Sequence, residues 1–184
     1  MKLILLRHEK RNLLQQSFFT PLTEDGMRDR FNLVNPLSNE NIDFIYSSPY
    51  LRTLETVLPT ADYLEKPIQI EYGLYEYLHN PFYTSLNWYH TVDELFGEYP
   101  YIQRYINDDY KSVVSIKDFY VLEDERNLEN RIIKMMNEII PRHRNDTVLL
   151  VSHQAVINKI KDLYVKPTKT NTEFPMGHYE VYYI

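Results

Sequence analysis

The sequence predicts an α/β fold in which a mostly parallel, doubly wound sheet lies between two layers of helices, a three-layer sandwich. The first observation is a unit that occurs three times: a short apolar run, a polar corner and a helical pattern. The apolar runs cover 3–6, 42–47 and 147–152. The second is the alternation of strand and helix patterns along the chain, typical of parallel sheets with helices on both faces. With 184 residues, 43% of them hydrophobic, the chain suits a single domain over 1–184.

The N-terminal part of the chain predicts one buried strand and one helix. The strand covers 2–6, and its apolar residues would face both helical layers, as in the interior of a parallel sheet. The helix covers 23–34, with Thr23 as its N-cap and two acidic residues in its first turn. We expect the Asn35-Pro36 pair to end this helix, because the residue before a proline avoids helical backbone angles.

The second unit consists of a strand over 42–47 and a helix over 48–64. Ser48 would cap this helix, and Pro49 would lie in its first turn, where a missing N–H costs nothing. A further proline falls inside the helix. Because its ring crowds the preceding turn, we expect a kink or a break over 57–60.

A short third strand is expected over 67–71, and the chain then changes in character. Ten of the seventeen tyrosines and the single tryptophan fall between residues 72 and 120. We interpret 77–120 as a helical, aromatic-rich insertion that caps the carboxyl ends of the strands. Its aromatic side chains would pack in a small core of their own, or form a lid that offers aromatic surface to a substrate, and the two roles are compatible.

Four further elements complete the predicted fold. They are an amphipathic helix from Leu128 that ends at Pro141, a strand over 147–152, a helix over 155–164 and a closing strand over 178–184. The resulting order of strands and helices, interrupted by the insertion, is that of a doubly wound α/β domain.

Composition excludes several classes of function. A net charge of -6 and a pI near 5.5 argue against binding to nucleic acid or an anionic membrane, since both require a basic face. The chain has no cysteine, which excludes disulfides, thiolate zinc sites and a cysteine nucleophile. The apolar run near the N-terminus is too short for a signal peptide or a spanning helix, so we expect a cytoplasmic protein.

Four basic side chains are expected to meet at one edge of the sheet. Arg7 and His8 follow the first strand, His153 follows the strand over 147–152, and Arg52 lies on the helix after the second strand. Ligands of open α/β sheets bind at the carboxyl ends of the strands. Two guanidinium groups and two imidazoles beside a helix N-terminus predict an anion site, and phosphate is the obvious anion.

Taken in order, these motifs resemble those of the histidine phosphatase superfamily, which has the phosphoglycerate mutase-like fold. The resemblance rests on Leu6-Arg7-His8, Pro21-Leu22-Thr23-Glu24-Asp25-Gly26, Ser47-Ser48-Pro49 followed by Arg52, Leu74-Tyr75-Glu76 and Val151-Ser152-His153. Any one of these pieces is weak evidence, but the ordered set is specific. The match covers 1–76 and 145–165.

The resemblance implies that His8 attacks phosphorus and becomes a phosphohistidine, while Arg7, Arg52 and His153 hold the phosphoryl oxygens. It also implies that Glu76 is the general acid for the leaving group and activates water in the second step. Elementary chemistry agrees, since phosphoryl transfer needs positioning and positive charge, which two arginines and a protonated imidazole supply. No metal or other cofactor is expected, and the sequence contains no carboxylate-rich cage for one.

The sequence departs from the family pattern at three positions. Glu9 and Gln154 follow the two histidines where the family usually has glycine. We expect Glu9 to face away from the site, or to pair with a neighbouring basic side chain, because an inward carboxylate would repel phosphate. Leu14 occupies the place of the family's asparagine, and Arg11 or Asn12 would take over as a phosphate ligand.

The sequence therefore predicts a metal-independent phosphatase that hydrolyses a small phosphorylated substrate, a phosphomonoester, through a phosphohistidine. One alternative is a mutase of the phosphoglycerate mutase type, which must grip a second anionic group. Residues 72–120 carry only three basic residues, Arg104, Lys111 and Lys117, against seven acids, which favours hydrolysis and is compatible with an aromatic or bulky ester. The other alternative is a catalytically silent module that binds phosphate.

Overall fold

A five-stranded, mostly parallel sheet forms the centre of the computed structural model, which describes residues 1–14, 17–79, 90–118, 123–165 and 173–184. The strands are β1 (Lys2–Arg7), β2 (Phe44–Ser47), β3 (Ile68–Ile70), β4 (Thr147–Ser152) and β5 (Tyr179–Tyr183). Their order in the sheet is β3-β2-β4-β1-β5. The first four strands run parallel, and β5 pairs antiparallel with β1 at the edge. The predicted α/β class is confirmed.

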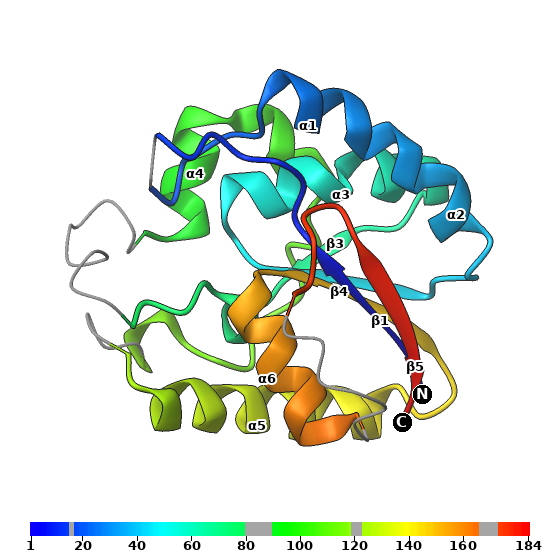
Figure 1. Ribbon diagram of the computed structural model, residues 1–184, viewed down its shortest axis with the longest axis vertical. Coiled ribbons are helices and arrows are strands. Elements are labelled where there is room, and N and C mark those ends of the chain that lie inside the picture. Colours follow the sequence, from blue (N-terminus) through cyan, green and yellow to red (C-terminus); the bar gives the residue numbers. More distant parts are fainter. Residues whose placement is uncertain (15–16, 80–89, 119–122, 166–172) are drawn as a thin grey trace.

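Helices cover both faces of this sheet (Figure 1). The elements α1 (Glu24–Asp29), α2 (Val34–Ser38) and α3 (Leu51–Leu64) lie on one side, and α5 (Glu125–Arg142) and α6 (Gln154–Tyr164) lie on the other. Alternate residues of β1 point into different cores: Ile4 and Leu6 join the cluster that contains α3, whereas Leu3 and Leu5 join the one that contains α5 and α6. This alternation explains why the strand is apolar throughout.

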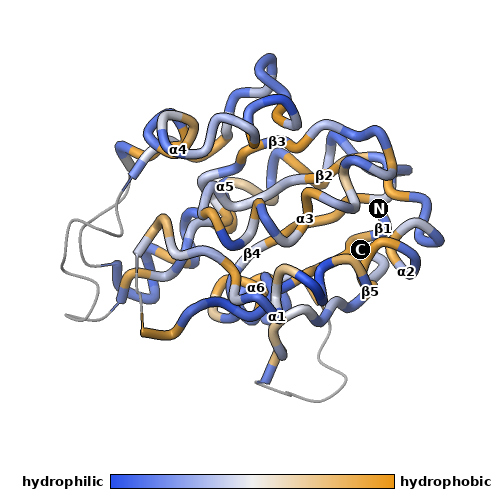
Figure 2. Tube along the Cα trace, turned by 90° about the horizontal axis from the view of Figure 1, so that it is seen from above, coloured by the Kyte–Doolittle hydropathy of each residue, from blue (hydrophilic) through white to orange (hydrophobic). Residues whose placement is uncertain are grey.

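Strand register aligns the ends of the parallel strands. Leu6 pairs with Val151, Val151 with Ser47, and Ser47 with Ile70, so the carboxyl ends of the four parallel strands are aligned. The residues that follow each strand are therefore neighbours at one edge. Both chain termini lie at the end of the molecule opposite α4 (Val92–Glu98), as Figure 1 and Figure 2 show.

The prediction that the first helix ends at Asn35-Pro36 is wrong. Thr23 caps α1 as expected, accepting from the Gly26 N–H at 3.1 Å. The chain then continues as a 3-10 turn (Arg30–Leu33) and as α2, which contains the proline. Pro36 lies in the first turn of α2, where its missing N–H would have no partner within the helix.

The expected break at Pro59 does not occur either, because α3 runs from Leu51 to Leu64. Proline removes the N–H that would bond to the carbonyl of Glu55. That carbonyl instead accepts from Nη1 of Arg30 at 2.8 Å, so the helix continues past the proline with this carbonyl satisfied. The predicted start is also corrected: Tyr50 is the N-cap residue, so Ser48 and Pro49 both precede the helix.

The described part of the 77–120 segment packs on the main core instead of forming its own. It contains α4, a 3-10 helix (Pro100–Tyr105) and a 3-10 turn (Ile116–Asp118), while 80–89 and 119–120 lie outside the described residues. Leu95 and Ile102 are fully buried in the same cluster as α3. In the parts of the chain that the structure describes, no helix has the length and apolarity needed to cross a bilayer.

Candidate active site

His8 follows β1 and is buried as a neutral ring. Its backbone N–H donates to the carbonyl of Ser152 at 3.1 Å, which ties it to the end of β4. Ring Nδ1 lies 2.7 Å from the carbonyl oxygen of Glu9, and since a carbonyl only accepts, Nδ1 carries the hydrogen and Nε2 keeps its lone pair. Burial, and then the charges of Arg52 and Arg7, lower the pKa of His8 well below its usual value. Nε2 is therefore available as a nucleophile at neutral pH.

His153 is the N-cap residue of α6, and its ring centroid lies 5.4 Å from that of His8. Its Nδ1 lies 3.2 Å from Oε2 of Glu76, and its Nε2 lies 2.9 Å from Oγ of Ser48. Nη2 of Arg52 donates to Nδ1 at 3.3 Å, so in the neutral ring Nδ1 accepts and Nε2 donates to Oγ of Ser48. Burial, and then Arg52 and His8, lower the pKa of His153 well below its usual value. The ring is neutral here at neutral pH, which differs from the protonated imidazole that the sequence suggested.

Arg52 is fully buried in the first turn of α3. Its Nη2 lies 3.1 Å from Oε2 of Glu76, and its Nη1 donates to the carbonyl of Ser17 at 3.2 Å. The guanidinium carbon lies 4.3 Å from the centre of the Tyr50 ring, which adds a cation–π contact. These contacts fix the plane and the direction of the guanidinium group.

The Glu76 carboxylate contacts two groups that the sequence predicted as phosphate ligands. Oε2 accepts from Nη2 of Arg52 and lies 3.2 Å from Nδ1 of His153, while Oε1 accepts from the Tyr77 N–H at 3.1 Å. An oxygen of a phosphoryl group could accept from the same Arg52 donor. The carboxylate therefore occupies a site that suits an anionic oxygen.

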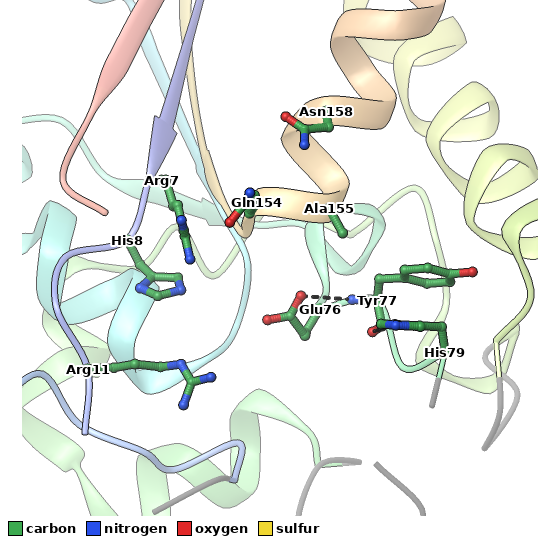
Figure 3. Close-up of a pocket in the computed structure, with 9 residues that line it drawn as sticks. All are labelled: Arg7, His8, Arg11, Glu76, Tyr77, His79, Gln154, Ala155 and Asn158. Carbon is green, nitrogen blue, oxygen red and sulfur yellow. Dashed lines mark hydrogen bonds between the residues drawn. The ribbon is translucent and has the colours of Figure 1, made fainter. Parts of the chain in front are cut away.

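A cavity of about 320 Å³ lies at this site (Figure 3). Its lining consists of Arg7, His8, Arg11, Glu76, Tyr77, His79, Gln154, Ala155 and Asn158. Figure 3 shows Glu76 in the middle, with His8 and Arg11 on one side and with Tyr77 and His79 on the other. Arg52 and His153 are buried beside the Glu76 carboxylate and are not part of the lining.

Of the other predicted ligands, the structure brings Arg7 and Arg11 to the cavity but leaves Asn12 outside. Nη1 of Arg7 donates to the carbonyl of Phe174 at 2.6 Å, and its buried Nε has no hydrogen-bond partner among the described residues. The guanidinium groups of Arg7 and Arg11 flank the His8 ring (Figure 3). Asn12 is exposed, and its Oδ1 accepts from the Leu14 N–H at 2.9 Å.

The two residues that replace glycine behave differently. Glu9 faces away from the cavity, as expected, and its carboxylate accepts from the backbone N–H of Lys10 at 3.2 Å. It packs against Gly177, which has a φ of +71° and where an added Cβ would lie only 2.0 Å from Oε1 of Glu9. Glycine at 177 thus makes room for the side chain at position 9. Gln154 lines the cavity near Arg7 (Figure 3).

Two features of the site were missed in the sequence. The hydroxyl of Ser48 holds His153, a contact across 105 positions that leaves no local pattern. Behind the site, Arg131 and Glu123 form a buried ion pair. A signal for the second feature exists, because Arg131 interrupts the apolar stripe that includes Leu128 and Ile132 on α5.

The chemistry of the site rests on nitrogen donors. Among the residues that the structure describes, no group of three or more His, Asp or Glu side chains is arranged to hold a metal ion. The cavity instead brings together a neutral imidazole, two guanidinium groups and a carboxylate. This set can bind a phosphoryl group, attack it and move a proton to or from a leaving oxygen.

Comparison with known proteins identifies the family. The sequence pattern of the histidine phosphatase superfamily (branch 1) matches residues 3–181. The chain belongs to this superfamily. Among curated relatives of this histidine phosphatase is phosphoserine phosphatase 1 from Hydrogenobacter thermophilus, which is 31% identical over 159 residues, 83% of this chain and 71% of that protein.

Solved structures confirm the fold of this histidine phosphatase. The ecdysone phosphate phosphatase from Bombix mori, in complex with tungstate, superposes with a TM-score of 0.74 at 16% identity, over 98% of this chain and 88% of that one. A phosphoserine phosphatase from Entamoeba histolytica, in complex with phosphoserine, gives a TM-score of 0.62 at 22% identity, over 98% and 89%. The prediction of a phosphatase with a phosphoglycerate mutase-like fold is confirmed.

Proposed function

We propose that this protein hydrolyses a phosphomonoester through a phosphohistidine on His8, without a metal ion. The observation that carries the proposal is the hydrogen bond from Nδ1 of His8 to the Glu9 carbonyl at 2.7 Å. This bond fixes the tautomer that leaves Nε2 free to attack, on a ring whose pKa is lowered by burial and by nearby arginines. A buried neutral imidazole between guanidinium groups suits nucleophilic attack on an anion.

The reaction has two steps. Nε2 of His8 attacks phosphorus, the P–O bond to the organic group breaks, and the carboxyl group of Glu76 gives its proton to the leaving oxygen. Water then attacks the phosphohistidine, Glu76 takes a proton from it, the P–N bond breaks, and inorganic phosphate leaves. Arg7, Arg52 and His153 would hold the phosphoryl oxygens, so Glu76 must first release the last two.

A metal is not required for this chemistry. The guanidinium groups of Arg7, Arg11 and Arg52 supply fixed positive charge, and the N–H groups of Arg52 supply directed donors. These groups supply the charge stabilisation and positioning that divalent ions supply in other phosphoryl transfer enzymes. Full activity in the presence of a strong chelator is therefore expected.

The far wall of the cavity supports an aromatic or bulky organic group on the substrate. The rings of Tyr77 and His79 are stacked, with centroids 4.4 Å apart and an interplanar angle of 19°. Gln154 and Asn158, one turn apart on α6, add two amides. We propose that 77–120 caps this wall. Phosphoserine is the competing substrate, because it is named in relatives of similar fold.

Hydrolysis is favoured over mutase activity by the position of the basic residues in the insertion. Arg104 lines a different cavity, near the end of α3, and Nζ of Lys111 donates to the carbonyl of Asp108. Neither these residues nor Lys117 contributes to the lining of the site. Among the described residues of the lining, Arg7 and Arg11 are the basic groups of fixed charge that a second anionic group on the substrate would meet.

A panel of phosphomonoesters, with released phosphate as the readout, tests the proposal. It would contain an aryl phosphate, an alkyl phosphate, a sugar phosphate and phosphoserine, each with and without EDTA. The wild-type protein should release phosphate and form an acid-labile phosphoenzyme, and His8→Ala should do neither. Equal rates for wild type and His8→Ala would favour a silent phosphate-binding module. Strict dependence on added 2,3-bisphosphoglycerate would favour the mutase.

A further inference from the structure

A buried ion pair lies directly behind the segment that carries Glu76. Nε of Arg131 lies 2.5 Å from Oε1 of Glu123, and Nη2 of Arg131 lies 2.9 Å from Oε2, which makes the pair bidentate. Both side chains are buried. Arg131 is on α5, and Glu123 is two residues before that helix.

The other donors of Arg131 point at the backbone of residues 73–76. Nη1 donates to the carbonyl of Gly73 at 2.7 Å, and Nη2 reaches the carbonyl of Glu76 at 3.3 Å. The helix is pressed against the same segment, because a Cβ added to Gly73 would lie 2.7 Å from Sδ of Met135. Arg131 therefore contacts the main chain of the proposed general acid and lies outside the cavity lining.

Stability alone is a poor reason for this ion pair. Desolvation of two buried charges offsets most of their attraction, and apolar replacements of similar volume are often neutral or stabilising. Arg131 falls among Leu128, Ile132 and Met135 on the apolar face of α5, where another apolar residue would pack well. What an apolar side chain could not provide is the pair of hydrogen bonds to the main chain at 73 and 76.

We infer that Arg131, held by Glu123, is a positioning residue for Glu76. The inference rests on the proposed function. By fixing the backbone at residues 73 and 76, Arg131 lets the Glu76 carboxylate leave Arg52 and reach the leaving oxygen without movement of the segment itself. Loss of this support would displace the acid, and small displacements of catalytic groups have large effects on rate.

Other anchors keep the segment folded when Arg131 is changed. Oγ of Ser152 donates to the carbonyl of Leu74 at 2.7 Å, and the Glu71 carboxylate accepts from the Gly73 N–H at 2.8 Å. An Arg131 variant should therefore lose the precise placement of Glu76 and keep the phosphate-binding groups at His8 and Arg52.

The test compares Arg131→Met, Arg131→Lys and Glu123→Gln on one alkyl and one aryl phosphate. Proton donation matters for the alkyl leaving group and little for a good aryl leaving group. For Arg131→Met we expect kcat to fall 10- to 100-fold on the alkyl ester and less than about threefold on the aryl ester, with KM nearly unchanged. Arg131→Lys should recover part of the alkyl rate. Arg142→Met, at an exposed position of the same helix, is the matched control.

The energetic coupling between Arg131 and Glu76 is a second measurement, and a purely structural role of Arg131 would not produce it. In the Glu76→Gln background, Arg131→Met should have little further effect on the alkyl rate. Equal losses on both esters, or fully additive losses with Glu76→Gln, would overturn the inference. If Arg131→Met does not fold, the same comparisons of the two esters and of the Glu76→Gln background are made with Arg131→Lys and Glu123→Gln. Failure of the proposed function looks different, because the wild type itself would then release no phosphate from the aryl ester.

Discussion

Oε2 of Glu76 lies 3.1 Å from Nη2 of Arg52, so the proposed general acid is bound to an arginine that should hold phosphate. The same oxygen lies 3.2 Å from Nδ1 of His153. Substrate phosphate and the Glu76 carboxylate therefore compete for the same place beside Arg52 and His153. This competition makes the affinity for anions depend on a residue whose own charge repels them.

Glu76→Gln should bind inorganic phosphate more tightly than the wild type does. A neutral amide interacts less strongly with Arg52 and does not repel the dianion, which we expect to be worth about 1.4 kcal/mol, or about tenfold in Kd. Calorimetric titration with phosphate measures the effect. Glu98→Gln, at an exposed position of α4, should leave Kd unchanged. A weaker or unaltered affinity in Glu76→Gln would show that the carboxylate does not compete.

Arg52→Lys should impair both binding and turnover. Lysine cannot reproduce the planar contact with Tyr50 together with the donor to Ser17 and the donor to the anion site. We expect kcat/KM on an aryl phosphate to fall on the order of 100-fold, the usual cost of losing a directed charge at the transition state. Steady-state kinetics, with exposed Arg142→Lys as the control, measure this loss. Retention of more than a third of the wild-type kcat/KM would contradict it.

Stability should fall as the pH drops through the usual range of histidine. Burial lowers the pKa of His8 and of His153 in the folded protein, so below about pH 6.5 the unfolded chain binds protons that the folded chain does not. Below this pH, each ring lowers the free energy of unfolding by about 1.4 kcal/mol for every unit that the pH falls. The effect ends at the pKa that the ring has in the folded protein.

Urea unfolding of the wild type and His8→Asn between about pH 5 and pH 8 measures this linkage. Below pH 6.5 the curve for His8→Asn should be shallower by about 1.4 kcal/mol per pH unit, and above it the two curves should run parallel. Parallel curves over the whole range would mean that folding does not lower the pKa of His8.

Arg30 and Pro59 should be energetically coupled through the Glu55 carbonyl. Arg30→Met removes the donor to this buried carbonyl and should cost about 1–2 kcal/mol of unfolding free energy. In the Pro59→Ala background, the N–H of residue 59 can donate to the Glu55 carbonyl within the helix. Arg30→Met should therefore lower the free energy of unfolding clearly less in that background. Chemical denaturation of the four proteins of this double-mutant cycle gives the coupling. Independent effects would show that Arg30 does not compensate for the proline.

Local patterns in the sequence predicted most of the scaffold correctly. Apolar runs identified the strands, since a strand covered on both faces must be apolar throughout. Thr23 marked a helix start because a cap acts within three residues of itself. The predictions at Pro36 and Pro59 were wrong because adjacent residues do not show what makes each proline acceptable. Pro36 is acceptable because α2 starts at Val34, and Pro59 because Arg30 donates to the Glu55 carbonyl.

The sequence by itself determined the α/β class and the meeting of Arg7, His8, Arg52 and His153, because each side chain follows a strand or begins a helix at one sheet edge. Only the tertiary structure decided the contacts within the site. Ser48 on His153, Glu9 against Gly177, and Arg131 behind Glu76 each join segments that are far apart in the chain. Such contacts depend on strand register and on which rotamers the packed neighbours allow, and a local sequence pattern predicts neither.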